Sequence, residues 1–211
     1  MRQHVEQSTV LGGAVFNVVL VEPEIPANTG NIGRTCVITG SRLHLVGPMS
    51  FALTDKAVQR AGLAYWDSLD LRTYDTWGDF VAQNPSVETG LQLSEHSPIH
   101  LLTKHGARIY TEAEYNDGDW LVFGKESFGL DATLLAQHPN LCERIPMRSD
   151  QALGNADAWH ESFSDLHPEL ERDICGNFVD RRAGQITSLN LSNAAAIVIY
   201  EALRQTGFAG L

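Results

Sequence analysis

The residues best suited to chemistry gather in a short polar segment near the end of the chain. Ser188-Leu189-Asn190-Leu191-Ser192-Asn193 runs directly into an apolar stretch, Ala194 to Arg204, that is long enough for a helix. Ser192 or Asn190 is suited to be the N-cap, because a short side-chain oxygen accepts a hydrogen bond from a free amide of the first turn. Such a helix N-terminus suits a polar ligand. A capped core helix without a ligand explains the same pattern, and the spacing alone favours it.

Two charged residues follow segments that are rich in glycine and asparagine. Arg34 comes after Asn28-Thr29-Gly30-Asn31, and its planar guanidinium is suited to hold a phosphate. Glu126 lies within Gly124 to Leu130, where its carboxylate would stand at the mouth of a pocket. Both also have an ordinary explanation, as a solvated arginine and as a carboxylate favoured at a helix start. Tyr200 lies in the apolar stretch of the last helix, and this pattern favours a place in the core.

Other common chemistries lack their motifs. No G-x-G-x-x-G follows the first apolar run, no G-K-[ST] marks a P-loop, and no G-x-S-x-G presents a nucleophile. Of three histidines, at 96, 100 and 105, the first two have the i, i+4 spacing that suits metal ligands on a helix. Pro98 interrupts them, and Ile99-His100-Leu101 alternates like a strand, so no metal is expected.

Apolar runs that alternate with helical patterns predict an α/β fold with a mostly parallel sheet. We expect strands at Val15–Val21, Leu43–Val46, Leu69–Tyr74, Ile99–Thr103, Trp120–Phe123 and Glu143–Met147, and helices at Ile32–Thr39, Thr54–Arg60, Thr76–Gln83, Asp131–Gln137 and the last apolar stretch. Glu22 to Asn31, with two prolines and a glycine, is expected to be a loop. The carboxyl ends of parallel strands share one edge, where ligands bind. That edge would gather the loops Leu102–Lys104, Gly124–Leu130 and Ile145–Met147, with Ser188–Asn193 as a fourth wall.

Length and composition indicate one globular domain over residues 15–211, preceded by a flexible tail at 1–14. No apolar run is long enough to span a membrane, and the first residues lack the pattern of a signal peptide. The three cysteines are an odd number, widely spaced and without a C-x-x-C pair, which favours reduced thiols in a cytoplasmic protein. Cys36, among aliphatic neighbours, is expected to be a core thiol.

Much of the formal charge of −11 lies in one segment. From Ser149 to Asp180 there are eight acidic residues and one basic residue, Arg172. The segment from about 149 to 185 shows no clear strand and interrupts the alternation, so we interpret it as an acidic insertion, with a short helix expected around Pro168 to Cys175. A lid, a partner-binding flap and partial disorder are all compatible with its composition.

Taken together, five blocks resemble the SPOUT class of RNA methyltransferases, in its TrmH/SpoU group. The resemblance is closest to the members that methylate the wobble nucleotide of tRNA, and it extends from about Val15 to Phe208. The blocks are E-P-E-I-P-A-N-T-G-N-I-G-R (22–34), D-K-A-V-Q-R-A-G-L (55–63), F-G-K-E-S-F-G-L (123–130), I-P-M (145–147) and S-L-N-L-S-N (188–193).

The resemblance implies helices on both faces of the sheet, a C-terminal trefoil knot and a homodimer. It implies that the protein methylates a ribose 2′-hydroxyl of tRNA with S-adenosylmethionine as the methyl donor. The implied catalytic residues are Asn28, Arg34, Glu126, Ser188 and Asn190. The implied cofactor contacts are Leu101, Thr103, Gly124, Ile145, Met147, Ser188, Leu189 and Asn193. Candidate phosphate contacts are Arg34, Arg42, Lys56, Arg60 and Lys104.

The chain departs from the group at a few positions, which leaves alternatives open. Close relatives often carry proline and arginine where this chain has Lys125 and Phe128, and a basic residue where it has Thr187. The acidic insertion also lengthens a connection beside the expected cofactor loops. Methylation of another tRNA or rRNA site is therefore a second hypothesis. A non-catalytic RNA-binding protein on the same fold is a third, and a nucleotide-dependent oxidoreductase is a weak fourth.

Overall fold

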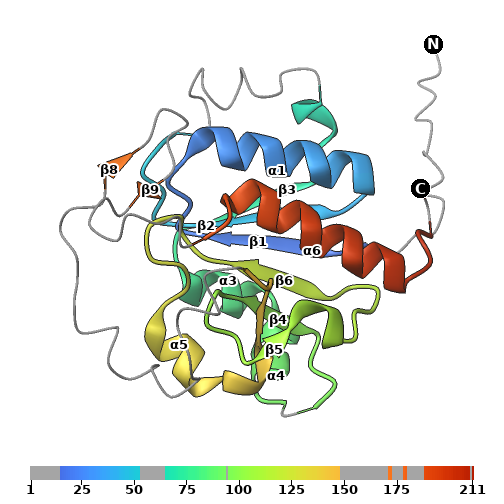
Figure 1. Ribbon diagram of the computed structural model, residues 1–211. Coiled ribbons are helices and arrows are strands. Elements are labelled where there is room, and N and C mark those ends of the chain that lie inside the picture. Colours follow the sequence, from blue (N-terminus) through green and yellow to red (C-terminus); the bar gives the residue numbers. More distant parts are fainter. Residues whose placement is uncertain are drawn as a thin grey trace.

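The computed structural model describes residues 15–52, 65–93, 95–147, 171–172, 178–179, 188–209 and 211. Within them, seven parallel strands form one sheet in the order β3-β2-β1-β6-β4-β7-β5 (Figure 1). The strands are β1 (Asn17–Val21), β2 (Arg42–Val46), β3 (Leu71–Tyr74), β4 (Ile99–Leu102), β5 (Arg108–Ile109), β6 (Trp120–Phe123) and β7 (Cys142–Arg144). The prediction of an α/β fold with a mostly parallel sheet is confirmed.

Helices cover both faces of this sheet. The long helices α1 (Pro26–Thr39) and α6 (Leu191–Gln205) lie side by side on one face, and α3 (Trp77–Gln83), α4 (Pro85–Leu91) and α5 (Ala132–Gln137) lie on the other (Figure 1). Short 3₁₀ turns at Trp66–Ser68, Tyr110–Glu112 and Pro139–Leu141 complete the connections. None of the helices in these described ranges is long and apolar enough to cross a membrane.

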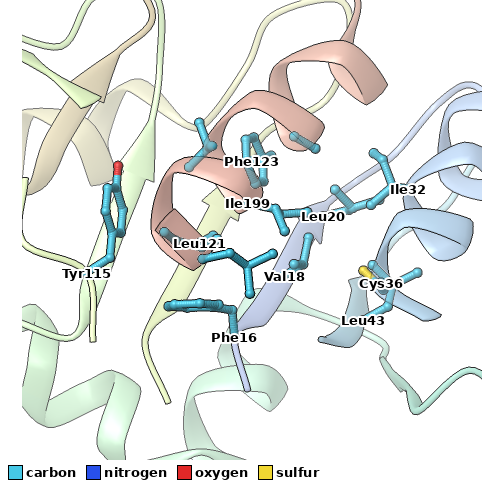
Figure 2. Close-up of a cluster of buried hydrophobic side chains, with 14 of the residues drawn as sticks. Phe16, Val18, Leu20, Ile32, Cys36, Leu43, Tyr115, Leu121, Phe123 and Ile199 are labelled. Atoms are coloured by element: carbon cyan, nitrogen blue, oxygen red, sulfur yellow. The ribbon is translucent and has the colours of Figure 1, made fainter. Parts of the chain in front are cut away.

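The core has two layers because successive strand residues point to opposite faces. Val18 and Leu20 of β1 pack in the layer beneath α1 and α6, which Figure 2 shows in close-up, while Val19 joins the layer on the other face. Cys36 of α1 is fully buried in the first layer, as predicted. Burial raises the pKa of its thiol, which keeps it protonated and unreactive.

Helix α1 begins six residues earlier than predicted. The segment Pro26 to Asn31, expected to be a loop, forms the first turns of the helix. Pro26 stands at the start of the helix, where its missing N–H costs no hydrogen bond and its fixed φ already suits the helical backbone. The helix ends as predicted at Gly40, whose φ of 68° is left-handed. Asn28 is therefore held on a helix rather than on a loop.

Other differences are local. Helix α4 and strand β5 were not predicted, and Tyr200, expected in the core, is 45% exposed. In the acidic insertion, β8 (Glu171–Arg172) pairs antiparallel with β9 (Phe178–Val179), so the helix expected around Pro168 to Cys175 is wrong at these positions. Phe and Val favour strands. The tail at 1–14, the helix expected at Thr54–Arg60 and the rest of the insertion lie outside the described residues.

The contact between α4 and β4 yields a stability prediction. A Cβ added at Gly90 of α4 would lie 2.6 Å from Ile99 Cγ1, whereas one at Gly78 of α3 would meet nothing closer than 3.7 Å. We expect Gly90→Ala to lower the free energy of unfolding by about 1–3 kcal/mol through overpacking. Gly78→Ala, the matched control, should be neutral or stabilising by up to ~1 kcal/mol. Urea unfolding of both variants measures this, and equal effects would contradict the close packing.

Candidate active site

The order of the strands singles out one place on the edge of the sheet. From β1 the chain passes through α1 to β2 on one side, while β6 pairs with β1 on the other side. In open parallel sheets, the crevice outside the carboxyl ends of strands at such a switch point is where ligands bind. The segment Glu22–Ile25 leaves β1 here, and the loop Gly124–Leu130 leaves β6 beside it.

Several interactions join these two segments. The Glu24 N–H donates to Glu126 Oε2 at 2.8 Å, and the Ser127 N–H donates to Glu24 Oε2 at 2.9 Å. Lys125 Nζ forms an ion pair with Glu22 Oε2 at 2.8 Å. A backbone N–H of each segment donates to a glutamate side chain of the other, so each segment fixes the conformation of the other.

The loop after β6 needs glycine at both of its ends. Lys125 and Gly129 exchange two backbone hydrogen bonds, of 3.2 and 2.8 Å, which close the loop into a tight turn. Gly129 has a left-handed φ of 75°. A Cβ on Gly124 would lie 2.0 Å from the carbonyl carbon of Gly129, so no larger residue fits there. The turn directs Glu126 back towards the start of α1.

Glu126 heads a chain of hydrogen bonds that reaches α6. Its Oε1 accepts from Asn28 Nδ2 at 2.9 Å and from the Ile25 N–H at 3.2 Å. Asn28 Oδ1 accepts from Asn190 Nδ2 at 3.0 Å, and Asn190 Oδ1 accepts from the N–H and hydroxyl of Ser192 at 2.9 and 2.6 Å. An ionised carboxylate only accepts, so Glu126 fixes the orientation of the Asn28 amide and, through it, that of Asn190.

The structure thus joins three of the five predicted catalytic residues, namely Asn28, Glu126 and Asn190. Asn190 is also the N-cap of α6, one of the two candidates that the sequence indicated. Ser188 is exposed and lies two residues before Asn190. Arg34 is on α1 too, but six residues after Asn28, which is roughly 9 Å along the axis and on another side of the helix.

Arg34 stands apart from the hydrogen-bond chain. It is exposed, and its guanidinium carbon lies 5.8 Å from the centre of the Tyr65 ring, a cation–π contact. Tyr65 in turn donates a 2.6 Å hydrogen bond to the Gly30 carbonyl of α1. The aromatic ring therefore holds the arginine at the surface, where a solvent-borne anion can reach it.

The predicted cofactor contacts occupy neighbouring strand ends. Leu101 pairs with Val122 and Cys142, which sets the ends of β4, β6 and β7 side by side. The residues that follow these strands are Thr103, Gly124, Ile145 and Met147, of which Gly124 is buried and the others are half-buried. Leu189 and Asn193, at the start of α6, are exposed. Leu101 is fully buried between the two flanking strands, so it has no exposed surface at this edge.

His100 of β4 belongs to a buried ionic cluster. Its Nδ1 lies 2.7 Å from Glu143 Oε1 and its Nε2 lies 3.2 Å from Asp119 Oδ2. Burial lowers the pKa of His100, but the hydrogen bonds to the two carboxylates outweigh it and raise the pKa overall. Tyr115 and Arg108 also donate to Glu143. The cluster fixes β4 to β7. The described residues hold no group of three or more His, Cys, Asp or Glu side chains that fits a metal ion.

Two cavities lie at opposite edges of the sheet. One, of about 510 Å³, has the first residues of β1 and β2, Asn17 and Arg42, in its wall, so it is far from the switch point. The other, of about 260 Å³, is lined by Glu22, Glu24 and Lys125 and therefore adjoins the switch point. The first cavity is larger, but the second adjoins the Glu126–Asn28–Asn190 hydrogen-bond chain. We therefore regard the second cavity as part of the site.

Sequence reasoning missed several residues of this site. Neither the exchange between Glu24 and Ser127 nor the Glu22–Lys125 ion pair was predicted. In the sequence, Glu22, Glu24 and Glu126 lie within two segments that contain glycine. This pattern does not tell which carboxylate accepts a hydrogen bond from which donor. Glu22 also has a left-handed φ of 50°, which costs a residue with a side chain about 1–3 kcal/mol and is typical of functional sites.

A methyltransferase family has this fold and these loops. Residues 15–155 match the SpoU rRNA Methylase family, and the chain belongs to that family. The tRNA (cytidine(34)-2′-O)-methyltransferase of Burkholderia cenocepacia is 36% identical over 197 residues, which cover 93% of this chain and 99% of that protein. The protein of the same name from Saccharophagus degradans is 36% identical over 198 residues, with 93% and 99% covered.

A solved structure agrees with these relatives. It is described as giving structural insights into the 2-OH methylation of C/U34 on tRNA, and it is 31% identical to this chain. It matches 92% of this chain and 97% of its own, with a TM-score of 0.66. The sequence-based assignment to the TrmH/SpoU group is thus confirmed.

The role of Glu126 as the shared acceptor yields a second prediction. Glu126→Gln replaces one carboxylate oxygen with an NH₂ group, which cannot accept a hydrogen bond. Because both oxygens accept from backbone N–H groups, at least one N–H loses its acceptor. We expect the free energy of unfolding to fall by about 1–3 kcal/mol. Glu114→Gln, a control at an exposed position, should change it by less than ~0.5 kcal/mol. Urea unfolding measures both, and a Glu126→Gln variant as stable as the control would rule out this role.

Proposed function

We propose that this protein methylates the 2′-hydroxyl of the wobble nucleotide, position 34, of tRNA, with S-adenosylmethionine as the methyl donor. The observation that carries the proposal is the Glu126–Asn28–Asn190 chain at the switch point of a SpoU methylase domain. The names of relatives that match almost end to end support the choice of substrate.

The polar groups at the site fit a polar cofactor. Thr29 Oγ1 and Ser127 Oγ, adjacent in sequence to Asn28 and Glu126, are buried and find no hydrogen-bond partner in the described part of the chain. A buried hydroxyl without a partner is unfavourable, and a bound ligand would supply one. The residues proposed to hold S-adenosylmethionine are Thr103, Gly124, Ile145, Met147, Ser188, Leu189 and Asn193. When bound, it supplies an electrophilic methyl group.

The residues of the chain align the acceptor and stabilise its charge. An in-line displacement needs the ribose oxygen held at close range in a fixed direction. The rigid Asn28 and Asn190 amides offer that orientation. A guanidinium group carries hydrogen-bond donors and no acceptor, so Arg34 is a poor base. We assign it to hold a phosphate and to favour the deprotonated ribose oxygen, which is electrostatic catalysis.

A homodimer is part of this proposal. Ile38 of α1 is 60% exposed, and Ile197 and Tyr200 of α6 are 37% and 45% exposed. The two helices lie side by side (Figure 1), so these apolar side chains occupy one face of the molecule. A second copy packed on that face would bury them and would extend the surface available to RNA. We also propose a single domain with an acidic insertion, the C-terminal trefoil knot of the resemblance and a cytoplasmic location.

A ribosomal or other tRNA 2′-O site is the second candidate substrate, favoured by the rRNA methylase description of the matched family. The first experiment separates these cases. Calorimetric titration with S-adenosylhomocysteine is followed by transfer from labelled S-adenosylmethionine to bulk tRNA that lacks 2′-O-methyl groups. Binding with label at nucleotide 34, found by nuclease mapping, supports the proposal. Binding without transfer to tRNA refutes the tRNA assignment, and no binding favours a non-catalytic RNA-binding protein.

The assignment of Arg34 makes a third prediction. Arg34→Lys keeps the charge but loses the planar pair of donors, so methyl transfer to tRNA should fall by roughly 100-fold or more. Binding of S-adenosylhomocysteine should be unchanged, because Arg34 lies outside the cofactor loops. Arg204→Lys is the matched control, since Arg204 is an exposed arginine of α6 that pairs with Glu201. Lost cofactor binding in Arg34→Lys would contradict the assignment.

The dimer makes a fourth prediction. Ile197→Asp places a charge in the centre of the proposed interface, so the protein should become monomeric at micromolar concentration and lose methyl transfer to tRNA. Leu93→Asp is the control, because Leu93 is 43% exposed just after α4, on the other face of the sheet. Light scattering after size-exclusion chromatography reports the mass. A wild-type protein that is already a monomer would refute the proposed interface.

A further inference from the structure

The larger cavity, of about 510 Å³, has no part in the reaction proposed above. It lies at the amino ends of β1, β2 and β6, whereas the segments that carry the hydrogen-bond chain leave the carboxyl ends. Strand β1 has five residues, so its two ends are roughly 16 Å apart. A ligand in this cavity would therefore be separate from the methyl acceptor. The volume is in the range usual for sites that take a small molecule.

The floor of the cavity is a polar patch on a sheet face that is otherwise apolar. Side chains two residues apart on a strand point to the same face. Asn17 therefore shares the face of Val19, and Arg42 and His44 share the face of Val46. Helices α3 and α4 pack on the apolar part of this face. The polar amino ends of the strands are left to line the cavity.

The buried part of the floor is a fixed, uncharged network. The Asn17 amide donates through Nδ2 to the Gly118 carbonyl at 2.8 Å, and its Oδ1 lies 3.2 Å from His44 Nε2. Because an amide oxygen only accepts, Nε2 carries the proton and Nδ1 accepts from the Tyr74 hydroxyl at 3.0 Å. Burial and the nearby Arg42 lower the pKa of His44 to about 4, so the ring is neutral at pH 7. The charge of the cavity then comes from its arginines.

Two arginines in the wall, Arg42 and Arg72, have hydrogen-bond donors to spare. Their Nε groups both donate to Asp70, at 2.6 and 3.3 Å, and Arg42 Nη1 donates to Asn17 Oδ1 at 3.3 Å. Nη2 of Arg42 and both Nη groups of Arg72 have no partner within the described ranges. One carboxylate shared by two guanidinium groups leaves one positive charge. No acidic residue is among the described residues that line the cavity, so in a chain of net charge −11 this place attracts an anion.

We propose that this cavity is a second ligand site, which binds a ribose phosphate with the phosphate on Arg42 and Arg72. A guanidinium group presents paired N–H donors that match the oxygens of a phosphate. The rest of the wall offers amide and hydroxyl groups from Gln83, Asn84 and Ser86, which suit the hydroxyls of a sugar. The ribose phosphate belongs either to a free nucleotide or to an RNA backbone, away from the methylated nucleotide. Only the RNA source rests on the proposed function.

The first measurement is a titration with ribose 5-phosphate, followed by the amide NMR signals of Gly118 and Trp120, which line the cavity. The protein is saturated with S-adenosylhomocysteine, so that the cofactor site is filled. We expect these signals to shift, and ribose without phosphate to leave them unchanged. Arg72→Gln should weaken the binding by roughly tenfold or more, and the same spectra report whether its fold is intact. Arg204→Gln is the matched control, because the two ion-paired arginine side chains are 60% and 61% exposed.

The second measurement is tRNA binding over a range of salt concentrations, which separates the two sources. If the ribose phosphate belongs to tRNA, Arg72→Gln weakens tRNA binding and lowers the slope of log Kd against log salt concentration by about one. Arg204→Gln should change neither quantity. An effect of Arg72→Gln on ribose 5-phosphate alone assigns the site to a free nucleotide.

The outcomes separate this inference from the proposed function. If ribose 5-phosphate causes no shift and Arg72→Gln leaves tRNA binding unchanged, the inference is overturned, whether or not the protein methylates tRNA. A protein that binds ribose 5-phosphate in this cavity but transfers no methyl group to tRNA would refute the proposed function and leave the second site in place.

Discussion

The site depends on one constraint, which is that an ionised carboxylate can only accept hydrogen bonds. Glu126 receives two backbone N–H groups from the segment after β1 and the amide of Asn28. Because both carboxylate oxygens are occupied by donors, the Asn28 amide has a single favourable orientation. The Asn28 oxygen accepts from the Asn190 amide and so orients it, and the Asn190 oxygen caps α6. One carboxylate thus positions the side chains of Asn28 and Asn190, which are 162 residues apart in the sequence.

The parallel sheet makes this convergence possible. Glu126 and Asn28 are 98 residues apart, yet β1 and β6 are neighbours, so the segments that leave their carboxyl ends start side by side. The Glu22–Lys125 and Glu24–Ser127 contacts then close the remaining gap. Gly124 is required because the returning loop passes too close for a side chain, and Gly129 is favoured because its φ of 75° is left-handed. The buried His100 cluster joins β4 to β7, the next strand in the sheet.

The sequence was informative where a local pattern has one physical solution. Apolar runs predicted β1, β2, β4 and β6, and the Ser/Asn segment before an apolar stretch predicted the Asn190 cap. The start of α1 was missed because proline has two opposite meanings, as a helix breaker and as a favoured first residue, and Pro26 has the second. Tyr200 was misplaced because a pattern of apolar residues does not tell a face buried in the core from one that is free to meet another chain.

The contacts of the carboxylates could not be predicted, because they depend on which backbone N–H groups the folded loops direct inwards. Their effect extends to the electrostatics of an acidic protein that we propose binds RNA. Three carboxylates near the site would repel phosphates, but Glu22 is paired with Lys125, and Glu24 and Glu126 accept from backbone N–H groups. Each negative charge is therefore partly compensated by nearby donors, while Arg34 stays exposed on the Tyr65 ring. Near the site, the pairing of each carboxylate with nearby donors therefore affects an approaching phosphate more than the net charge of −11 does.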